Sequence, residues 1–336
     1  MMGKDREMKN KKNSFGANAA TIFSKYGIYF ILLMFVVIMS LAHDRFLSKE
    51  NLLNMLRQVS ITGGIALGMC FVIASGGIDL SAGSIVALAS VVGATFAKGE
   101  YPLIVPIVVT ITVAALCGLI NGTIIAKTGL APFIVTLGMT EVARGAAMLF
   151  TEGRPINNFF APFKFIGQGY FLGVPMPIYI FIVLIVICWI LLHRSKFGRY
   201  LLATGGNPLA AKVSGINVDW IVIKAFLIEG ILVGVAAVVF IARTGSASPG
   251  YAEGYELDAI AACAIGGVSM NGGRATMLGV VVGALIIGVI NNGLNLLNVS
   301  SYVQYVVKGC IIVLAVILDR ATTARATKIA AMQANS

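Results

Sequence analysis

The sequence predicts an all-α, polytopic membrane protein with about ten transmembrane helices, one of them short or re-entrant, and with both chain ends cytoplasmic. Of its 336 residues, 58% are hydrophobic and only 12% are charged, whereas a soluble domain carries roughly 25% charged residues. The mean hydropathy is +0.91, and long apolar runs alternate with short charged stretches. This composition excludes a soluble enzyme.

Ten apolar runs are bounded by charged residues, and most approach the ~20 residues that an α-helix needs to cross the hydrocarbon core. In the first half of the chain the runs are 26–42, 58–78, 80–97, 101–126 and 130–150. In the second half they are 174–192, 220–242, 257–270, 275–297 and 300–318. The eighth run is short for a crossing, so we expect a half-helix or a re-entrant segment packed inside the protein.

Glycine pairs at a spacing of four recur within these runs. Such pairs allow the backbones of neighbouring helices to approach closely, so we expect a tightly packed bundle. The pairs are Gly64/Gly68, Gly118/Gly122, Gly230/Gly234 and Gly279/Gly283.

The basic residues of the loops predict the orientation. With ten crossings, one side carries fifteen Lys and Arg residues and the other carries seven, and the richer side is expected to be cytoplasmic. The net charge of +11 does not indicate nucleic-acid binding, which needs a basic cluster on one solvated face. We divide the chain into a basic cytoplasmic N-terminal segment (1–25), a transmembrane domain (26–318) and a cytoplasmic tail (319–336), and expect no cleaved signal peptide.

Several charged residues lie inside apolar runs. Glu141 and Arg144 are three residues apart on one helical face, where a salt bridge would lower the cost of placing both in the membrane. Such a pair either fixes helix packing or faces a water-filled pathway, and the sequence leaves both open. Lys308 is expected to snorkel to the outer membrane surface. Lys224 and Glu229, five residues apart, do not share a face and need other partners.

Amide side chains also lie within or beside apolar runs, and an amide in hydrocarbon requires a hydrogen-bonding partner. Bonds between helices are the simplest role. Lining a pathway for a hydroxyl-rich solute is the alternative, because such a solute needs both donors and acceptors. The residues are Asn121, Asn291, Asn292, Asn295 and Gln304.

The sequence offers no catalytic, metal or cofactor site. His43 and His193 lie singly at the ends of runs, and the cysteines show no C-x-x-C spacing, so no metal-ligand set forms. A phosphate-binding loop of the form G-x-x-x-x-G-K-[ST] is absent, so we expect no ATP hydrolysis by that route. The cysteines, expected to pack in the core, are Cys70, Cys117, Cys188, Cys263 and Cys310.

The loop 193–219 is the longest loop on the side predicted to be cytoplasmic. Asn207 can cap a short helix with Pro208 in its first turn, and Gly215 can end that helix. The helix either lies flat at the membrane interface or offers its small residues to a partner. The residues alone leave both interpretations open.

Beyond about residue 45, the sequence resembles the permease subunits of bacterial ABC importers for ribose and related sugars, such as galactosides, xylose and arabinose. The resemblance rests on the order and spacing of strings that are weak singly but highly specific together. They are SGGIDLSAGS (75–84), EGRPI (152–156), FGRY (197–200), GGNPLAAKVSGINV (205–218), GYELDAIAACAIGG (254–267) and NNGLNLLNVSSYVQ (291–304).

The resemblance implies a multi-pass permease of the bacterial inner membrane, not an enzyme, working as a homodimer or with a sister permease. It would bind cytoplasmic ATPase subunits, receive a ribose-like sugar from an extracytoplasmic binding protein, and switch between inward-facing and outward-facing states when the ATPases close. The resemblance also implies a coupling helix to the ATPase, formed by Gly205, Gly206, Asn207, Pro208, Ala210, Ala211, Lys212, Ser214 and Gly215.

Candidate residues for the other roles follow from the polar pattern and the expected topology. Residues expected to line the pathway are Asn121, Glu141, Arg144, Asn291 and Asn292. Charges of the outer loops expected to contact the binding protein are Arg154, Arg243, Glu253 and Glu256.

Two other classes of protein compete with this interpretation. A proton-coupled secondary transporter would use Glu141 or Glu229 to load and release the proton, and it would have no ATPase partner. A passive channel or a scaffold would need neither a docking helix nor alternating states.

Overall fold

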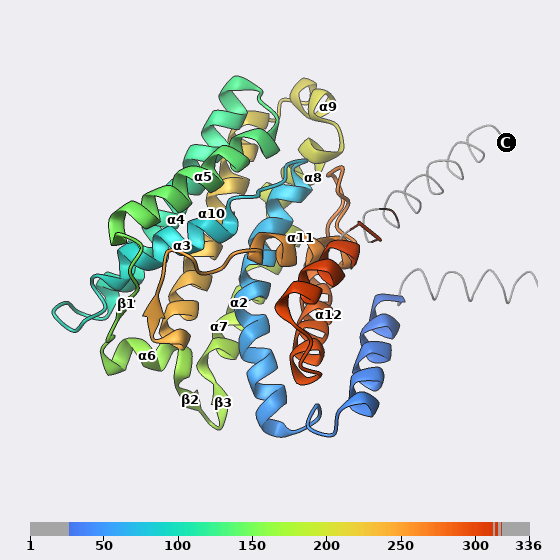
Figure 1. Cartoon of the computed structure of the whole chain (residues 1–336). Coiled ribbons are helices and arrows are strands. Elements are labelled where there is room, and N and C mark those ends of the chain that lie inside the picture. Colours follow the sequence, from blue (N-terminus) through green and yellow to red (C-terminus); the bar gives the residue numbers. More distant parts are fainter. Residues whose placement is uncertain (1–26, 312, 315–316, 318–336) are drawn as a thin grey trace, which may run out of the picture.

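The computed structural model describes residues 27–311, 313–314 and 317 (Figure 1). The regular secondary structure of the described chain is helical apart from four strands of two residues each. The segments 1–25 and 319–336, which we predict to be cytoplasmic, lie outside the described residues.

Six helices in the described part of the chain are long and apolar enough to cross a membrane. They are α2 (Lys49–Ala74), α4 (Ile104–Thr128), α5 (Pro132–Thr151), α7 (Met176–His193), α10 (Val218–Thr244) and α12 (Met277–Leu296). Two shorter apolar helices are Gly27–Ala42 and α3 (Ala82–Ala94). Each of the ten apolar runs overlaps a helix, but the number of ten crossings and the orientation stay predictions.

Two of the runs form short helices. The eighth run forms α11 (Tyr255–Ile265), which has 11 residues and is shorter than a crossing requires. The third run forms α3, which has 13 residues. Sequence length alone indicates the short α11, whereas α3 is shortened because residues 75–81 form a non-helical connector before it, with a turn at 75–76.

α2 and α10 form the centre of the bundle. In the most apolar window of each helix, 83% of the α2 residues and 78% of the α10 residues are buried, against 17% for α5 and 22% for α7. α4 packs along α10, and the predicted close approach of glycines is confirmed there. A Cβ added at Gly118 would contact the carbonyl oxygen of Phe226, and one added at Gly234 would lie 2.7 Å from the Cα of Ile111.

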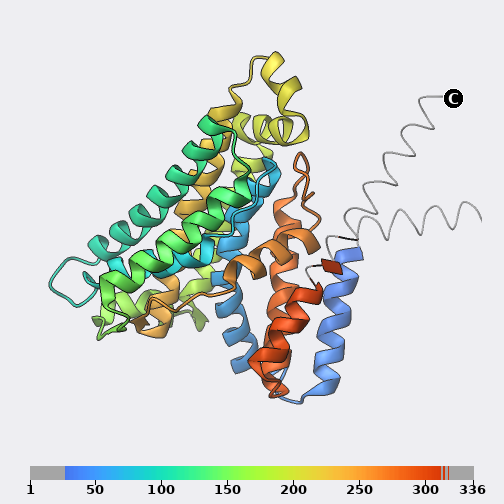
Figure 2. The same cartoon turned by 45° about the horizontal axis from the view of Figure 1, so that its top comes forward.

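The two ends of the bundle differ. One end carries α8 (Lys196–Gly206) and α9 (Pro208–Val213), and we call it the α9 end. The opposite end carries α6 (Ala161–Gln168) and a hairpin of β2 (Tyr170–Phe171) and β3 (Val174–Pro175), and we call it the hairpin end. Figures 1 and 2 show these ends at opposite sides of the bundle, with the helix Gly27–Ala42 beside α12.

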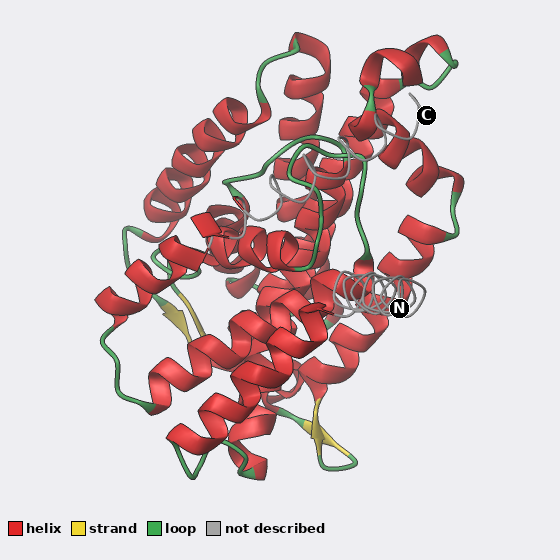
Figure 3. Cartoon of the chain, turned by 90° about the vertical axis from the view of Figure 1, so that its right-hand side faces the viewer, coloured by secondary structure: helices red, strands yellow, loops and turns green. Residues whose placement is uncertain are grey.

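A second small ladder joins two loops that are far apart in the sequence. β1 (Ile156–Asn157) pairs antiparallel with β4 (Ser246–Ala247), with Ile156 opposite Ala247. Figure 3 shows both ladders as yellow strands in an otherwise helical chain. The loop after α5 is thereby tied to the loop after α10.

Candidate translocation and coupling sites

The predicted ion pair between Glu141 and Arg144 is wrong. Arg144 is half-buried, and its guanidinium donates to the backbone carbonyl oxygens of Pro249 (2.5 Å) and Tyr251 (2.9 Å). Among the described residues, no ion pair within 4.0 Å involves either Glu141 or Arg144. Two backbone carbonyls of the loop before α11 accept charge-assisted hydrogen bonds from the guanidinium, so Arg144 does not need a carboxylate partner.

Glu141 lies on the exposed face of α5, near the middle of that helix. Gly138 and Gly145, one turn before and one turn after it, have open space where a side chain would be. A carboxylate at this depth is costly against lipid, so it is expected to face water or protein. The large apolar residues exposed on the same helix are Phe133, Ile134, Leu137, Val142, Met148, Leu149 and Phe150.

The amides expected either to line the pathway or to bond between helices make hydrogen bonds to other parts of the described chain. Asn292 of α12 and Asn51 of α2 exchange two side-chain hydrogen bonds of 2.8 and 2.9 Å. Asn291 is buried and donates to Asp258 of α11. Asn121 of α4 is fully buried and donates to Ser81 at 3.0 Å. The expected bond between helices is therefore confirmed for Asn291 and Asn292, whereas Asn121 bonds to the connector before α3.

The prediction that Lys308 snorkels outward is also wrong. Its ammonium group lies 2.9 Å from a carboxylate oxygen of Asp258, and the two side chains are only 22% and 4% exposed. The partner lies on another helix, 50 residues earlier in the chain. The nearby ion pair satisfies the ammonium within the protein, so Lys308 does not need to extend toward the headgroups.

The loop 193–219 forms two helices instead of the single short one that the sequence indicates. α9 begins as predicted, because the side chain of Asn207 accepts a hydrogen bond from the Ala210 amide at 2.9 Å. After α9 the backbone turns at Gly215, whose φ is +83°. α8 was not expected, and it is stabilised by packing of its buried face, which includes Leu201 and Gly205.

The coupling candidates divide into buried residues and exposed residues. Gly205 is buried, and a Cβ there would contact the carbonyl oxygen of Ala74 at the end of α2. Ala211 is also buried, at 4% exposure. The other predicted coupling residues are exposed. Sequence reasoning missed the two most exposed apolar residues of α9, which are Leu209 at 73% and Val213 at 83%.

The charges expected to contact a binding protein are not equally accessible. Arg154 and Glu253 are exposed, whereas Arg243 and Glu256 are half-buried. Glu256 packs against α3, since a Cβ added at Gly83 would meet its carboxylate oxygen. Arg154 and Glu253 are therefore the better placed of the four to contact a partner.

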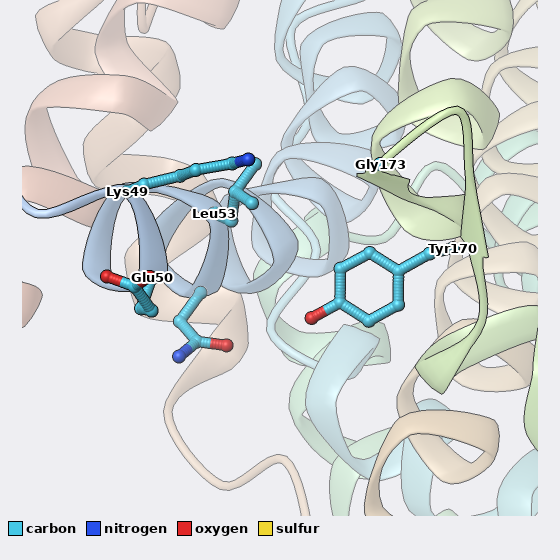
Figure 4. Close-up of a pocket in the computed structure, with 6 residues that line it drawn as sticks. Lys49, Glu50, Leu53, Tyr170 and Gly173 are labelled. Carbon is cyan, nitrogen blue, oxygen red and sulfur yellow. The ribbon is translucent and has the colours of Figure 1, made fainter.

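A pocket opens at the hairpin end, between the start of α2 and the β2–β3 hairpin (Figure 4). Its volume is about 430 Å³. The Arg57 guanidinium lies 5.1 Å from the centre of the Tyr170 ring, a cation–π contact that joins α2 to the hairpin. The residues that line the pocket are Lys49, Glu50, Leu53, Asn54, Tyr170 and Gly173.

The part of the chain that the structure describes contains no cluster of three or more His, Cys, Asp or Glu residues that could hold a metal ion. Four of the cysteines are buried, as expected, whereas Cys310 is exposed. Sequence reasoning missed Asp79, which is fully buried in the connector before α3. The string SGGIDLSAGS marks its position but does not indicate its contacts.

Comparisons with known proteins agree over most of the chain. Residues 51–316 match the family described as branched-chain amino acid transport system / permease component. The chain is 44% identical over 305 residues to the ribose import permease protein RbsC of Bacillus subtilis, covering 90% of this chain and 95% of the relative. It is 42% identical to the Escherichia coli (strain K12) protein of the same name, covering 86% and 91%.

A third relative differs in the sugar it is named for. The D-allose transport system permease protein AlsC of Escherichia coli (strain K12) is 39% identical over 305 residues, covering 90% of this chain and 94% of the relative. No solved structure matches the chain.

Proposed function

The chain belongs to the family of transport permeases described as branched-chain amino acid transport system / permease component, and from that premise we propose that it imports a ribose-like monosaccharide. It is a transmembrane permease of the sugar ABC transporter type, a transport subunit and not an enzyme. The finer proposal is an ATP-driven, binding-protein-dependent importer in which this chain forms the translocation pathway. The observation that carries it is the similarity to ribose import permeases along nearly their whole length.

Ribose is the leading solute because three relatives from separate bacteria are named ribose import permeases. Other relatives are named for allose, arabinose or galactose, which are also sugars. The description of the family names branched-chain amino acids instead. A branched-chain amino acid is therefore the alternative solute, and an experiment has to compare its uptake with that of ribose.

The pathway in this proposal lies between two copies of the chain. Support comes from α5, whose exposed apolar face carries Glu141 near its middle. A second copy packed near this face would remove its carboxylate from lipid and give it a water-filled space. Because the pathway amides already bond to other segments of the same chain, Glu141 is the pathway candidate that remains available to a solute.

The α9 end is proposed to bind the ATPase. α9 is a six-residue helix that presents Leu209 and Val213 outward, and an exposed apolar pair is typical of a binding surface. Gly205 packs the preceding helix directly against the end of α2. A force on α9 would thus reach a central helix of the bundle through backbone contact.

The remaining assignments follow from this orientation. The α9 end faces the cytoplasm of a bacterial cell, as the excess of basic loop residues on that side predicts. The hairpin end faces the outside and contacts the sugar-binding protein, with the exposed Arg154 and Glu253 among the contacts.

Uptake into membrane vesicles tests the proposal. Vesicles are made from cells that express the chain with its ATPase and binding protein, and accumulation of labelled ribose and labelled leucine is measured. We expect ribose accumulation that requires ATP and no leucine accumulation. Ribose uptake that persists without ATP but with a proton gradient would overturn the ATP-driven mechanism, and uptake of leucine alone would overturn the sugar assignment.

A pair of variants connects this activity to α9. Ala210→Glu places a charge on the exposed surface of α9, whereas Ala203→Glu places the same charge on an exposed position of α8. We expect the first change to remove binding of the ATPase in a pull-down from detergent and the second to leave it intact. Equal binding by both variants would place the docking surface elsewhere.

A further inference from the structure

A second pocket opens at the α9 end, between α8 and the start of α10. Its volume is about 500 Å³, and α8 packs directly against α10. The side chains of Tyr200, Trp220 and Lys224 are part of its lining, and none of the residues that line it is acidic. The pocket therefore combines two aromatic rings with one positive charge.

Lys224 is the charged group of this pocket. It lies on α10, six residues after that helix begins at Val218, which is roughly 9 Å along the helix axis. Lys224 is exposed, and in the described part of the chain it belongs to no ion pair within 4.0 Å. An ammonium group at this depth in a membrane protein reaches toward the headgroups or toward another anion.

The acid next to the pocket in the sequence is already paired. Asp219 lies 3.2 Å from the ammonium group of Lys127, at the end of α4. Lys127 therefore balances the charge of Asp219, and the pocket keeps the positive charge of Lys224. An anion from outside the chain would find this charge available.

The two aromatic side chains indicate that the pocket lies at a membrane surface. Trp220 is 56% exposed and Tyr200 is 44% exposed. Tryptophan and tyrosine are enriched where hydrocarbon meets the headgroups, because their rings are apolar and their N–H and O–H groups are polar. Trp220 and Lys224 are four residues apart, so they lie on one face of α10. Basic pockets of this kind bind the headgroups of anionic lipids.

The same face of α10 stays exposed beyond the pocket. Most of this helix is buried, but Trp220, Lys224 and Ile231 are exposed, and Leu227 and Ile228 are half-buried. Spacings of three and four residues place these side chains on one side of the helix. An apolar strip thus runs from Lys224 toward the middle of α10, where an acyl chain would cover it.

We propose that this pocket binds an anionic phospholipid of the membrane leaflet at the α9 end, with the lipid phosphate at Lys224 and an acyl chain along the exposed face of α10. The phosphate supplies the partner that Lys224 lacks within the chain. A phospholipid fits better than inorganic phosphate, because the site continues into the apolar strip. The inference depends on α10 crossing the membrane and not on which solute is carried.

Fluorescence quenching by brominated lipids tests the proposal at Trp220 itself. The chain has two tryptophans, so Trp189→Phe leaves only Trp220 and keeps an aromatic ring at position 189. This full-length variant is reconstituted into vesicles of phosphatidylcholine and phosphatidylglycerol. Bromine is placed on the acyl chains of one lipid or of the other, and quenching at matched mole fractions gives the preference of the site for the anionic lipid.

Lys224 should determine that preference. We expect phosphatidylglycerol to be preferred at Trp220 by a factor of about five, the effect of one basic residue near anionic headgroups. Lys224→Gln should abolish the preference, and Lys224→Arg should keep it. Lys196→Gln is the matched control, because it removes the same charge from an exposed position of α8 that does not line the pocket.

Equal quenching by the two brominated lipids in the parent variant would overturn the proposal. Equal loss of the preference in Lys224→Gln and Lys196→Gln would also overturn it, because the charge of the whole surface would then attract the lipid. So would an absence of quenching by either lipid, which would show that a second copy of the chain or another surface covers the pocket. Should Trp189→Phe fail to fold, the difference between the wild-type chain and Trp220→Phe isolates the same signal.

Inorganic phosphate in the buffer tests the other source of the anion. We expect it to leave the quenching by brominated phosphatidylglycerol unchanged, since it cannot occupy the apolar strip. Displacement of the brominated lipid by inorganic phosphate would show that the site binds free phosphate, and it would overturn the assignment to a lipid.

Discussion

Lys308 and Asp258 form an ion pair of 2.9 Å that joins the helix beginning at residue 301 to α11. Asp258 also accepts a hydrogen bond from Asn291 of α12 at 3.4 Å. One buried carboxylate thus holds three helices of the C-terminal part of the chain together. The partial exposure of Lys308, at 22%, leaves the carboxylate as the more deeply buried member of the pair.

Removal of this lysine is expected to destabilise the protein. Lys308→Met leaves Asp258 as a buried charge without a cation, and breaking a buried pair from one side costs about 3 to 5 kcal/mol. Thermal unfolding in detergent measures the change. The added substitution Asp258→Asn should recover part of the loss, because it removes the uncompensated charge.

An exposed ion pair supplies the control for that experiment. Lys127 and Asp219 lie 3.2 Å apart with side chains 62% and 47% exposed. Lys127→Met should change the free energy of unfolding by only ~0–1 kcal/mol, as is usual for surface pairs. Equal losses for Lys308→Met and Lys127→Met would show that the Lys308 pair is not a buried anchor.

Glycine at position 205 is expected to be indispensable, whereas its neighbour is not. Gly205→Ala would place a methyl group against the carbonyl oxygen of Ala74, and backbone of this kind cannot move aside cheaply. At Gly206 the nearest atom to an added Cβ is 3.8 Å away, which is an ordinary contact. We expect Gly205→Ala to lower the melting temperature and Gly206→Ala to leave the melting temperature unchanged.

The cap of α9 should matter for coupling more than for folding. Asn207→Ala removes the hydrogen bond to the Ala210 amide, which is worth about 1 kcal/mol of helix stability. Since α9 is exposed and short, we expect the melting temperature of the bundle to stay unchanged while ATPase binding weakens. Asn217→Ala is the matched control, because it removes the same kind of cap from α10, outside the coupling residues. A large fall in melting temperature for Asn207→Ala would contradict this prediction.

Glu141 and Arg144 are expected to act independently. Arg144→Met removes two hydrogen bonds to the loop before α11 and should lower the melting temperature. Glu141→Gln changes an exposed side chain, so it should leave the melting temperature unchanged and lower solute uptake. Because the two side chains form no ion pair, the double variant should be as unstable as Arg144→Met alone, within ~0.5 kcal/mol. Recovery of stability in the double variant would contradict this prediction and support an ion pair between Glu141 and Arg144.

The sequence predicts the helices better than the contacts between them. Apolar length predicts the helical runs and the short α11, because a helix in the membrane satisfies its own backbone. α8 was missed because its glycine-rich sequence does not favour a helix, and its stability comes from packing against α7, α10 and α2. The start of α9 could be predicted, because the Asn207 side chain accepts a hydrogen bond from an amide only three residues away.

The partners of charged side chains could not be predicted in the same way. Arg144 bonds to backbone carbonyls more than 100 residues later in the chain, and no spacing rule detects a carbonyl. Asp258 and Lys308 are both visible as charges, but their segments meet only in the folded bundle. Asp79 lies in a string that carries the resemblance, yet only the structure shows that Asn121 of α4 donates a hydrogen bond to it.

The ladder between β1 and β4 limits how this end of the molecule can be re-engineered. Ile156 and Ala247 are register partners, so an inserted residue on one side of the ladder would shift the pairing of the other loop as well. The two loops therefore have to be changed together. A chimaera that takes its docking specificity from a relative should exchange residues 151–173 and 243–256 together, because the register pairs Ile156 and Asn157 of one segment with Ala247 and Ser246 of the other.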